Sequence, residues 1–356
     1  MLGFSVYLHE ALTQHEIDRI QRYADVGFEG VFTSINLPED DPSQLISNLA
    51  ALGDICKANH LQMTLDVSTN ALDRLDISRA HLDTFEKLGV STLRIDDGFD
   101  MTEIAQLSQK FQIALNASTI TSADIDVLTA NQADFTHLEA WHNYYPREFT
   151  GLDEEWFANR NRWLQANGFT VMAFVPGDGE RRGPVFAGLP TLEKQRYMHP
   201  LAAMIEMKRL AVTHVFIGDP ELKATTLAQI EAYTQQNILE IHAMLSAQAP
   251  NYFDRVLHQR ADVARDVVRI VEGRLLLQNK IAAINTISRN HGAITLDNHR
   301  SGRYEGELEL IKCSLPADPS VNVIGQIVPA DLDLLNFIDA NQAIQIVNVE
   351  SETYNG

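Results

Sequence analysis

The chain has 356 residues, of which 45% are hydrophobic and 21% are charged. This length predicts two domains, and the composition is that of a globular protein, which excludes disordered and fibrous classes. With 28 basic and 48 acidic residues the formal charge is −20, so the long-range positive field that attracts nucleic acid or anionic lipid is missing. A small anionic ligand stays compatible wherever arginines cluster.

The N-terminal segment lacks the features of a signal peptide, and the sequence has no apolar run of about 18 residues. Cys56 and Cys313 are far apart and show no metal-ligand spacing. We therefore expect a cytoplasmic protein with no membrane segment, no disulfide, no metal and no cofactor. The sequence makes no prediction about the oligomeric state.

Residues 1 to about 220 repeat one unit, in which a short apolar run is followed by polar residues and then by a helical pattern. The helical pattern closes at Gly or Asn, and Thr13 to Glu16 has the spacing of a capping box. We expect strands at 3–8, 30–35, 61–67, 91–95, 111–116, 133–138, 169–174 and 213–218.

Eight β-then-α units within about 245 residues favour a (β/α)8 TIM barrel, an α/β fold, over a doubly wound open sheet. The absence of GxGxxG after the first strand weakens the dinucleotide-binding alternative. Residues 221–247 predict one long helix. Short β-rich runs follow, from GRLLLQNK at 273–280 to AIQIVNV at 343–349. The predicted domains are thus a barrel over 1–245 and a smaller β domain over 246–356.

Active sites of such barrels lie at the C-terminal ends of the strands. Glycosidic bonds are usually cleaved by two carboxyl groups, and this rim offers more than two, each of which also suits a helix cap or a solvated turn. The candidate carboxylates are Asp66, Asp96, Asp97, Asp178, Glu180, Glu193 and Asp219.

Two loops of this rim suit a sugar and an anion. Residues 142–147 combine an imidazole, an amide, two phenols and a guanidinium, which suits sugar binding or a packed loop. Residues 176–193 place four glycines around Arg181 and Arg182, a pattern typical of phosphate loops but also common in solvated ones. In the second domain, His299, Arg300 and Arg303 suggest an anion contact or an exposed hairpin.

These segments together resemble a bacterial family, once catalogued as uncharacterised outer surface proteins, that is associated with 6-phospho-N-acetylmuramidase activity. The resemblance rests most specifically on HNYYPREFTGL at 142–152, GPVFAGLPTLE at 183–193 and DNHRSGRYEGEL at 297–308. It implies a glycosidase barrel with a cyclophilin-like C-terminal domain. It also implies hydrolysis of the β-1,4 bond of MurNAc-6-phosphate–GlcNAc, a phosphorylated amino-sugar disaccharide, during peptidoglycan recycling.

The resemblance and the positions at the barrel rim together predict the site residues. We expect Asp96 and Glu193 as the catalytic pair, with Asp66 and Asp178 in reserve. The expected substrate-binding residues are Asn116, His142, Asn143, Tyr145, Arg147, Gly183, Gly188, Arg300, Arg303 and Tyr304. A phosphosugar isomerase, aldolase or lyase on the same barrel, or a non-catalytic phosphosugar-binding protein, stays open as an alternative.

Overall fold

The computed structural model describes residues 1–36, 42–247, 249, 253, 255–276 and 279–350, with the backbone alone for residues 42, 43, 80 and 96. The chain divides into two compact units, Met1–Leu227 and Ala228–Gly356. The boundary falls inside one helix, α9 (Ala224–Gln236).

Within the described part of the first unit, eight parallel strands close into a barrel in chain order, with β8 hydrogen-bonded to β1. The strands are β1 (Leu2–Ser5), β2 (Gly30–Ser34), β3 (Gln62–Ser68), β4 (Val90–Asp97), β5 (Gln112–Asn116), β6 (Leu138–Trp141), β7 (Thr170–Val175) and β8 (His214–Ile217). The prediction of a (β/α)8 barrel is confirmed.

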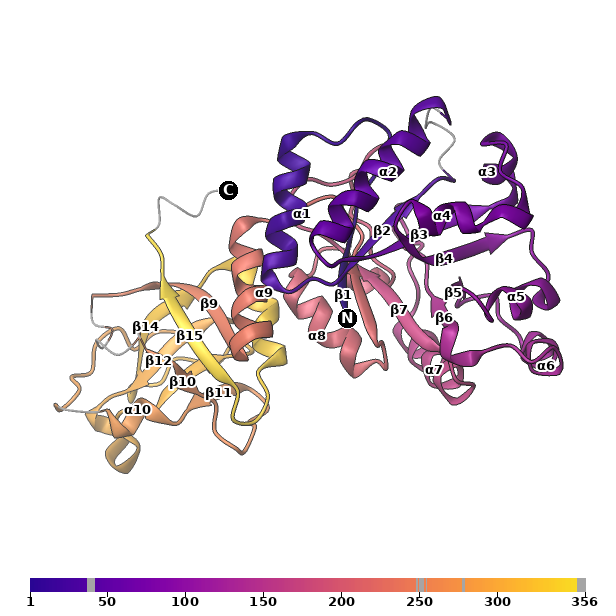
Figure 1. Ribbon diagram of the computed structural model, residues 1–356. Coiled ribbons are helices and arrows are strands. Elements are labelled where there is room, and N and C mark those ends of the chain that lie inside the picture. The colour runs from indigo at the N-terminus through magenta and orange to yellow at the C-terminus, as the bar shows by residue number, and fades with distance from the viewer. Residues whose placement is uncertain (37–41, 248, 250–252, 254, 277–278, 351–356) are drawn as a thin grey trace. The chain divides into compact units, whose positions relative to one another are not determined.

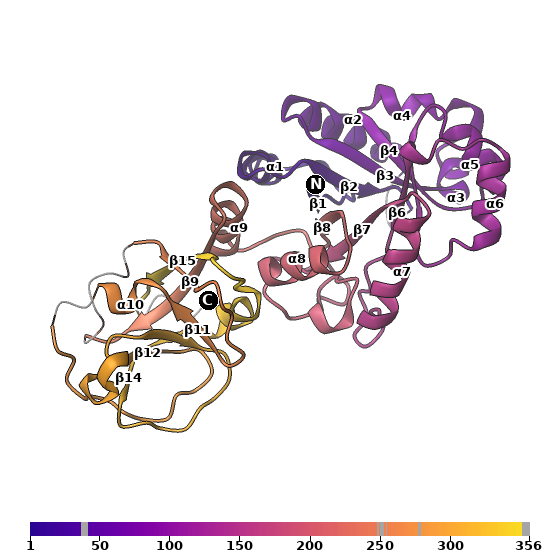
Figure 2. The same cartoon turned by 90° about the horizontal axis from the view of Figure 1, so that it is seen from below.

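Helices cover the outside of these strands (Figure 1), and Figure 2 shows the same arrangement from below. They are α1 (Gln14–Val26), α2 (Pro42–Ala58), α3 (Thr69–Arg74), α4 (Asp83–Lys87), α5 (Met101–Leu107), α6 (Ser122–Ala130), α7 (Glu154–Ala166) and α8 (Pro200–Arg209), with 3-10 turns η1 (Arg79–His81), η2 (Phe135–His137) and η3 (Glu193–Gln195). Because the strands are covered on both sides, they read as continuous apolar runs rather than as alternating ones.

Helix α1 begins as the capping-box spacing predicts. The Glu16 amide donates to Thr13 Oγ1 at 3.3 Å, and the Thr13 amide donates to Glu16 Oε2 at 2.8 Å. The helix ends at Gly27, whose φ of 104° is left-handed and therefore favours glycine. The glycine that separates the helical pattern from the next apolar run in the sequence therefore ends helix α1 in the structure.

Aromatic side chains fill the barrel interior. Trp141, Phe174 and Phe216 pack together, with ring centroids of Trp141 and Phe216 5.0 Å apart. A Cβ on Gly3 would come within 2.2 Å of the Phe216 ring, so glycine at this position leaves the room that the ring occupies. The interior is a packed core, and ligands are restricted to its mouth.

Two of the predicted segments are wrong within the first 247 residues. The sixth strand is LEAW at 138–141 rather than 133–138, because Asp134 accepts from the Thr136 amide and starts the 3-10 turn η2. The predicted helix over 221–247 ends at Gln236. Asn237 then adopts a left-handed φ of 56°, and β9 (Ile238–Leu245) follows.

In the described part of the second unit, seven strands form one sheet in the order β10-β15-β9-β14-β12-β13-β11. Its other elements are β10 (Leu257–His258), β11 (Val267–Ile270), α10 (Glu272–Leu275), β12 (Ala293–Asp297), η4 (His299–Tyr304), β13 (Leu308–Ile311), β14 (Val321–Ile327), η5 (Pro329–Phe337) and β15 (Ala343–Asn348). A smaller β-rich domain is confirmed.

One strand predicted for this domain is wrong. The segment 273–280 begins in helix α10, and residues 277 and 278 lie outside the described residues. The neighbouring strands β10 and β11 were not predicted.

Candidate active site

Polar side chains from several strands meet at the C-terminal mouth of the barrel. Asp66 lies near the end of β3 and Arg94 in β4, whereas Tyr7 follows β1 and Tyr144 follows β6. Arg182 comes from the long loop after β7. Asp66 and Arg94 form one bonded pair, Arg182 contacts both Tyr144 and Tyr7, and the charges of Asp66 and Arg94 act on Tyr144. We call these five side chains together the polar floor of the mouth.

Asp66 is the best-oriented carboxylate of this floor. Ser34 Oγ and Asn36 Nδ2 donate to its Oδ2 at 2.9 and 2.8 Å. Arg94 Nη1 donates to Oδ1. The strand register explains the meeting, because Asp66 pairs with Ser34 on one side and Arg94 on the other, so the three side chains share one face. Arg94 Nη2 also reaches Asn143 Oδ1, which links β4 to the loop after β6.

Two phenols and a guanidinium form the opposite part of the floor. Tyr7 donates to the Gly218 carbonyl at 2.7 Å, and Arg182 Nη1 donates to the Tyr144 hydroxyl at 3.0 Å. The Arg182 guanidinium also lies 4.1 Å from the centre of the Tyr7 ring. Burial raises the pKa of Tyr7 and of Tyr144, so both phenols stay protonated at neutral pH and can donate hydrogen bonds.

The loop after β7 is held by a buried carboxylate at the end of β8. Asp219 Oδ2 accepts from the Gly177 and Leu189 amides at 2.9 and 3.0 Å, and Oδ1 accepts from the Arg182 amide at 3.4 Å. Burial raises the pKa of Asp219, and these backbone bonds oppose that shift. The carboxylate therefore fixes the loop that carries the Arg182 side chain into the mouth. Gly188 of this loop has a left-handed φ of 82°.

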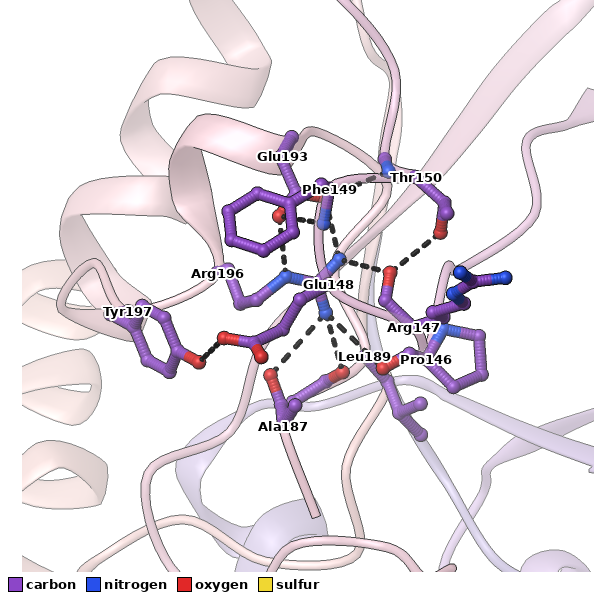
Figure 3. A network of polar contacts seen from close by, with 12 residues as sticks. Pro146, Arg147, Glu148, Phe149, Thr150, Ala187, Leu189, Glu193, Arg196 and Tyr197 are labelled. Atoms are coloured by element: carbon purple, nitrogen blue, oxygen red, sulfur yellow. Dashed lines mark hydrogen bonds and ion pairs between the residues drawn. The ribbon is translucent and has the colours of Figure 1, made fainter. Parts of the chain in front are cut away.

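Glu193 lies between the loops that follow β6 and β7 (Figure 3). Its Oε1 accepts from the Phe149 amide at 2.9 Å, and its Oε2 accepts from the Gly151 amide at 2.7 Å. Arg196 donates to both oxygens, at 2.7 and 2.6 Å. These hydrogen bonds lower the pKa of Glu193 to about 2, and the bond from Arg196 has the largest effect. Glu193 is thus a carboxylate that organises loops.

Arg196 is 2% exposed and joins the same two loops (Figure 3). Its guanidinium donates to the carbonyls of Arg147, Ala187 and Gly188 at 3.1, 3.3 and 3.2 Å. One buried cation therefore ties residues 147–151 to residues 187–188. The Arg147 side chain itself is exposed and points away from this network in Figure 3.

His142 is fully buried behind the barrel wall. Its Nε2 lies 2.7 Å from Asn161 Oδ1, and its ring packs 4.6 Å from the Phe157 ring of α7. Burial lowers the pKa of His142 to about 4, so the imidazole is neutral at pH 7. In this position the ring lies between β6 and α7 and does not reach the mouth.

Other predicted residues make hydrogen bonds to partners outside the polar floor. Asp178 Oδ1 and Oδ2 accept from the Lys223 amide at 2.9 Å and Thr226 Oγ1 at 2.6 Å, which caps helix α9. Asn116 Oδ1 accepts from the Ser118 amide at 3.0 Å. Tyr145 is half-buried, and its amide donates to the Pro190 carbonyl at 2.9 Å.

Two further predicted residues are placed less directly. Asp96 belongs to β4, two residues beyond Arg94, but its side chain lies outside the described residues. Gly183 lies in the loop after β7, where an added Cβ would come within 2.9 Å of the Phe186 ring.

The candidate residues of the second unit form a local group. Arg300, Arg303 and Tyr304 are exposed on η4, where Arg303 Nη2 donates to the Tyr304 hydroxyl at 2.7 Å. The Arg303 guanidinium lies 4.8 Å from the centre of the Tyr304 ring. Their exposure leaves them accessible to a ligand, and their hydrogen bonds are made within the second unit.

Neither a metal site nor a membrane span occurs among the residues that the structure describes. Within them, no group of three His, Cys, Asp or Glu side chains is arranged to hold a metal ion. Likewise, none of the helices in the described ranges has the length and apolarity needed to cross a membrane.

Sequence comparisons place the chain in a family. The profile described as 6-phospho-N-acetylmuramidase, N-terminal, matches residues 2–232, and its C-terminal counterpart matches residues 238–347. The chain belongs to the 6-phospho-N-acetylmuramidase family. It is therefore a glycoside hydrolase, and the family name implies a phosphorylated muramic sugar as substrate.

Solved structures resemble the whole chain. A conserved protein of unknown function from Enterococcus faecalis is 40% identical, with a TM-score of 0.90 over 98% of this chain and 96% of that one. An uncharacterised Bacillus cereus protein is 23% identical, with a TM-score of 0.75 over 98% and 99%, and shows the fold alone. No curated protein matches the sequence.

Three residues of the candidate site were not predicted from the sequence. Tyr7 and Arg94 contribute to the polar floor, and Arg196 joins two of its loops. Arg94 left a signal, because a charged residue inside an apolar strand needs a buried partner. Tyr7 and Arg196 left none, since their roles depend on residues that are distant in the chain.

Proposed function

We propose that the chain hydrolyses the β-1,4 bond of MurNAc-6-phosphate–GlcNAc and releases MurNAc-6-phosphate and GlcNAc. The observation that carries this proposal is the polar floor, in which Asp66 lies among Ser34, Asn36 and Arg94 at the mouth of a barrel. A cytoplasmic role in peptidoglycan recycling fits this reaction, because a phosphorylated disaccharide is formed and retained inside the cell.

Asp66 and Asp96 are the carboxyl groups that we assign to the reaction. Ser34, Asn36 and Arg94 fix the orientation of the Asp66 carboxylate at the mouth. Because each carboxylate oxygen has two lone pairs, Oδ1 keeps one that can accept from a water molecule or face the anomeric carbon. Asp96, near the end of the neighbouring strand β4, would supply the proton for the leaving oxygen. This pair replaces the one expected from the sequence, because Glu193 has other partners.

Glu193 and Asp178 receive structural roles in this proposal. A general acid must hold a proton near neutral pH, whereas the pKa of Glu193 is lowered to about 2. Both carboxylate oxygens of Asp178 accept hydrogen bonds at the start of α9, from the Lys223 amide and from Thr226 Oγ1. Removing the Glu193 or the Asp178 side chain should therefore lower the stability of the protein rather than slow bond cleavage in the folded state.

Arg182 and the two phenols suit the anionic groups of the substrate. A guanidinium binds phosphate or carboxylate with directed hydrogen bonds, and the protonated phenol of Tyr144 can donate to the same oxygens. The single hydroxyl proton of Tyr7 is already donated to the Gly218 carbonyl, so Tyr7 helps to position Arg182. Arg182, Tyr7 and Tyr144 are in mutual contact at the mouth, so one of the two anions of the substrate, its phosphate or its lactyl carboxylate, would bind there.

The proposal is tested with the purified full chain in 18O-labelled water, with neither metal nor nucleotide added. Hydrolysis predicts release of GlcNAc and one labelled oxygen at C1 of MurNAc-6-phosphate, beyond the exchange seen when that product is incubated alone. Absence of release over hours with a verified substrate would contradict it. Tight binding without release would favour a binding protein, and conversion without label would favour an isomerase, aldolase or lyase.

A further inference from the structure

The loops that follow β6 and β7 present two phenyl rings to solvent. Phe149 is 88% exposed and Phe186 is 62% exposed. Side chains of this size usually lie in the core, so two of them on loops at the ligand-binding end of a barrel are candidates for contact with a ligand.

Both rings stand on strained backbone. Phe149 has a φ of 65° and Phe186 a φ of 56°, in the left-handed region that large side chains rarely adopt. Glycine would take this conformation without strain. Neither exposed ring gains enough burial within the protein to offset the strain, and such positions tend to occur where the backbone serves a ligand.

The surrounding loops hold this conformation. The Phe149 amide donates to Glu193 Oε1 at 2.9 Å, and the Phe186 amide donates to the Arg182 carbonyl at 3.2 Å. Arg196 donates to Arg147 and Ala187, each within two residues of one of the rings. Figure 3 shows Phe149 and Ala187 on opposite sides of the Arg196 guanidinium. The rings are therefore presented by braced loops, which lowers the entropy cost of binding.

The same loops continue into the polar floor. Arg182 lies four residues before Phe186 and reaches Tyr144 in the mouth, and Asn143 lies six residues before Phe149 and bonds Arg94. A polar rim borders the rings, because Tyr197 donates to Glu148 and lies 5.4 Å below the Arg181 guanidinium. This pattern of flat apolar faces with polar edges matches a sugar, whose C–H face is apolar and whose rim carries hydroxyls.

We propose that Phe149 and Phe186 form an aromatic subsite that stacks on the leaving sugar, an uncharged N-acetylated hexosamine. This inference rests on the proposed function and extends it to the sugar on the far side of the scissile bond. The anionic sugar belongs with Arg182 and the phenols, whereas a neutral ring with an apolar face belongs with phenyl rings. The two residues contact substrate but take no part in bond cleavage.

The test compares two ligands that share the phosphorylated muramic sugar. The first is the disaccharide MurNAc-6-phosphate–GlcNAc, for which the KM is measured. The second is the methyl glycoside of MurNAc-6-phosphate, which lacks the leaving sugar and is measured as an inhibitor of disaccharide cleavage. The variants are Phe149→Leu and Phe186→Leu, which keep apolar volume but lose the flat face, and Phe149→Tyr, which keeps it. We expect each leucine variant to raise the KM about five- to tenfold, to leave the inhibition constant unchanged and to keep the wild-type Tm. Phe149→Tyr should keep the wild-type KM, because its ring retains the flat face.

Two outcomes overturn the subsite. In the first, both leucine variants keep the wild-type KM for the disaccharide. In the second, the KM for the disaccharide and the inhibition constant of the methyl glycoside rise by the same factor. If Phe149→Leu does not fold, Phe149→Gly removes the ring and relieves the left-handed backbone, and the same comparison applies. Failure of the proposed function is distinguishable, because the wild-type protein would then release no GlcNAc at all.

Discussion

The Arg196 guanidinium donates to both carboxylate oxygens of Glu193, through Nε at 2.7 Å and Nη2 at 2.6 Å. The same carboxylate accepts from Phe149 and Gly151, and the same guanidinium donates to carbonyls of the neighbouring loop. This pair therefore shapes the rim beside the polar floor, although neither residue belongs to the floor itself.

Arg196→Lys should loosen both loops. Lysine offers a point charge in place of a planar fork and cannot reproduce the bonds to the carboxylate and to several carbonyls together. We expect the free energy of unfolding to fall by about 2 to 4 kcal/mol and amide exchange to accelerate at residues 147–151 and 187–189. Arg162→Lys on the exposed face of α7 is the matched control. Unchanged exchange in Arg196→Lys would show that the loops are held by other contacts.

Glu193→Gln should have an effect that depends on pH. The pKa of Glu193 is lowered from 4.5 to about 2, so its ionised form stabilises the fold fully above pH 4.5, and this contribution is lost as the pH falls through 2. We expect Glu193→Gln to be less stable than wild type at pH 6, with the gap narrowing as the pH falls from 4.5 toward 2. Urea unfolding at each pH measures it. A gap independent of pH would contradict the role of the charge.

His142→Ala tests whether this histidine serves packing or substrate. A fully buried ring against Phe157 and Asn161 leaves a cavity when removed, so we expect a loss of about 3 kcal/mol in stability. Because the ring does not reach the mouth, the KM of the folded variant should stay near the wild-type value. A large rise in KM with normal stability would instead support the substrate contact expected from the sequence.

In the second unit, Asp297 and Glu309 should make stability fall as the pH rises. Burial raises the pKa of Asp297 to about 6 and that of Glu309 to about 7, and the negative charge of Glu307 adds to both shifts. The native state holds these protons longer than the unfolded chain, so stability decreases between about pH 4 and pH 7. We expect slower amide exchange in β12 and β13 at pH 5 than at pH 8, after correction for intrinsic exchange rates. Glu309→Gln should reduce that difference, and an identical difference in the variant would refute the assignment.

The fold was largely predictable because each barrel strand carries its own signal. A run such as TVMAFV in β7 is apolar enough to identify a strand covered on both sides, and Thr13 with Glu16 marks a helix start from four residues of sequence. The segment 238–245 was not predictable in the same way. Its residues suit a continued helix, and its strand depends on pairing with β15, about a hundred residues later.

Strand position predicts a region for the candidate site but not the direction of its side chains. Position after a strand does not distinguish Asp66, which bonds Arg94, from Asp178, which accepts from Thr226 at the start of α9. His142 and Asn143 are adjacent, yet one is buried behind the wall and the other bonds Arg94. Such differences follow from side-chain direction, which the three-dimensional packing decides.

The most direct test of the proposed mechanism measures GlcNAc release from MurNAc-6-phosphate–GlcNAc by wild type, Asp66→Asn and Asp96→Asn side by side. Asp178→Asn is the control, because asparagine can still cap α9. We expect release by wild type and the control, and a loss of kcat of about a thousandfold or more in both other variants when folded protein is assayed below its Tm. Absence of release by wild type, or normal release by Asp66→Asn and Asp96→Asn, would contradict the account.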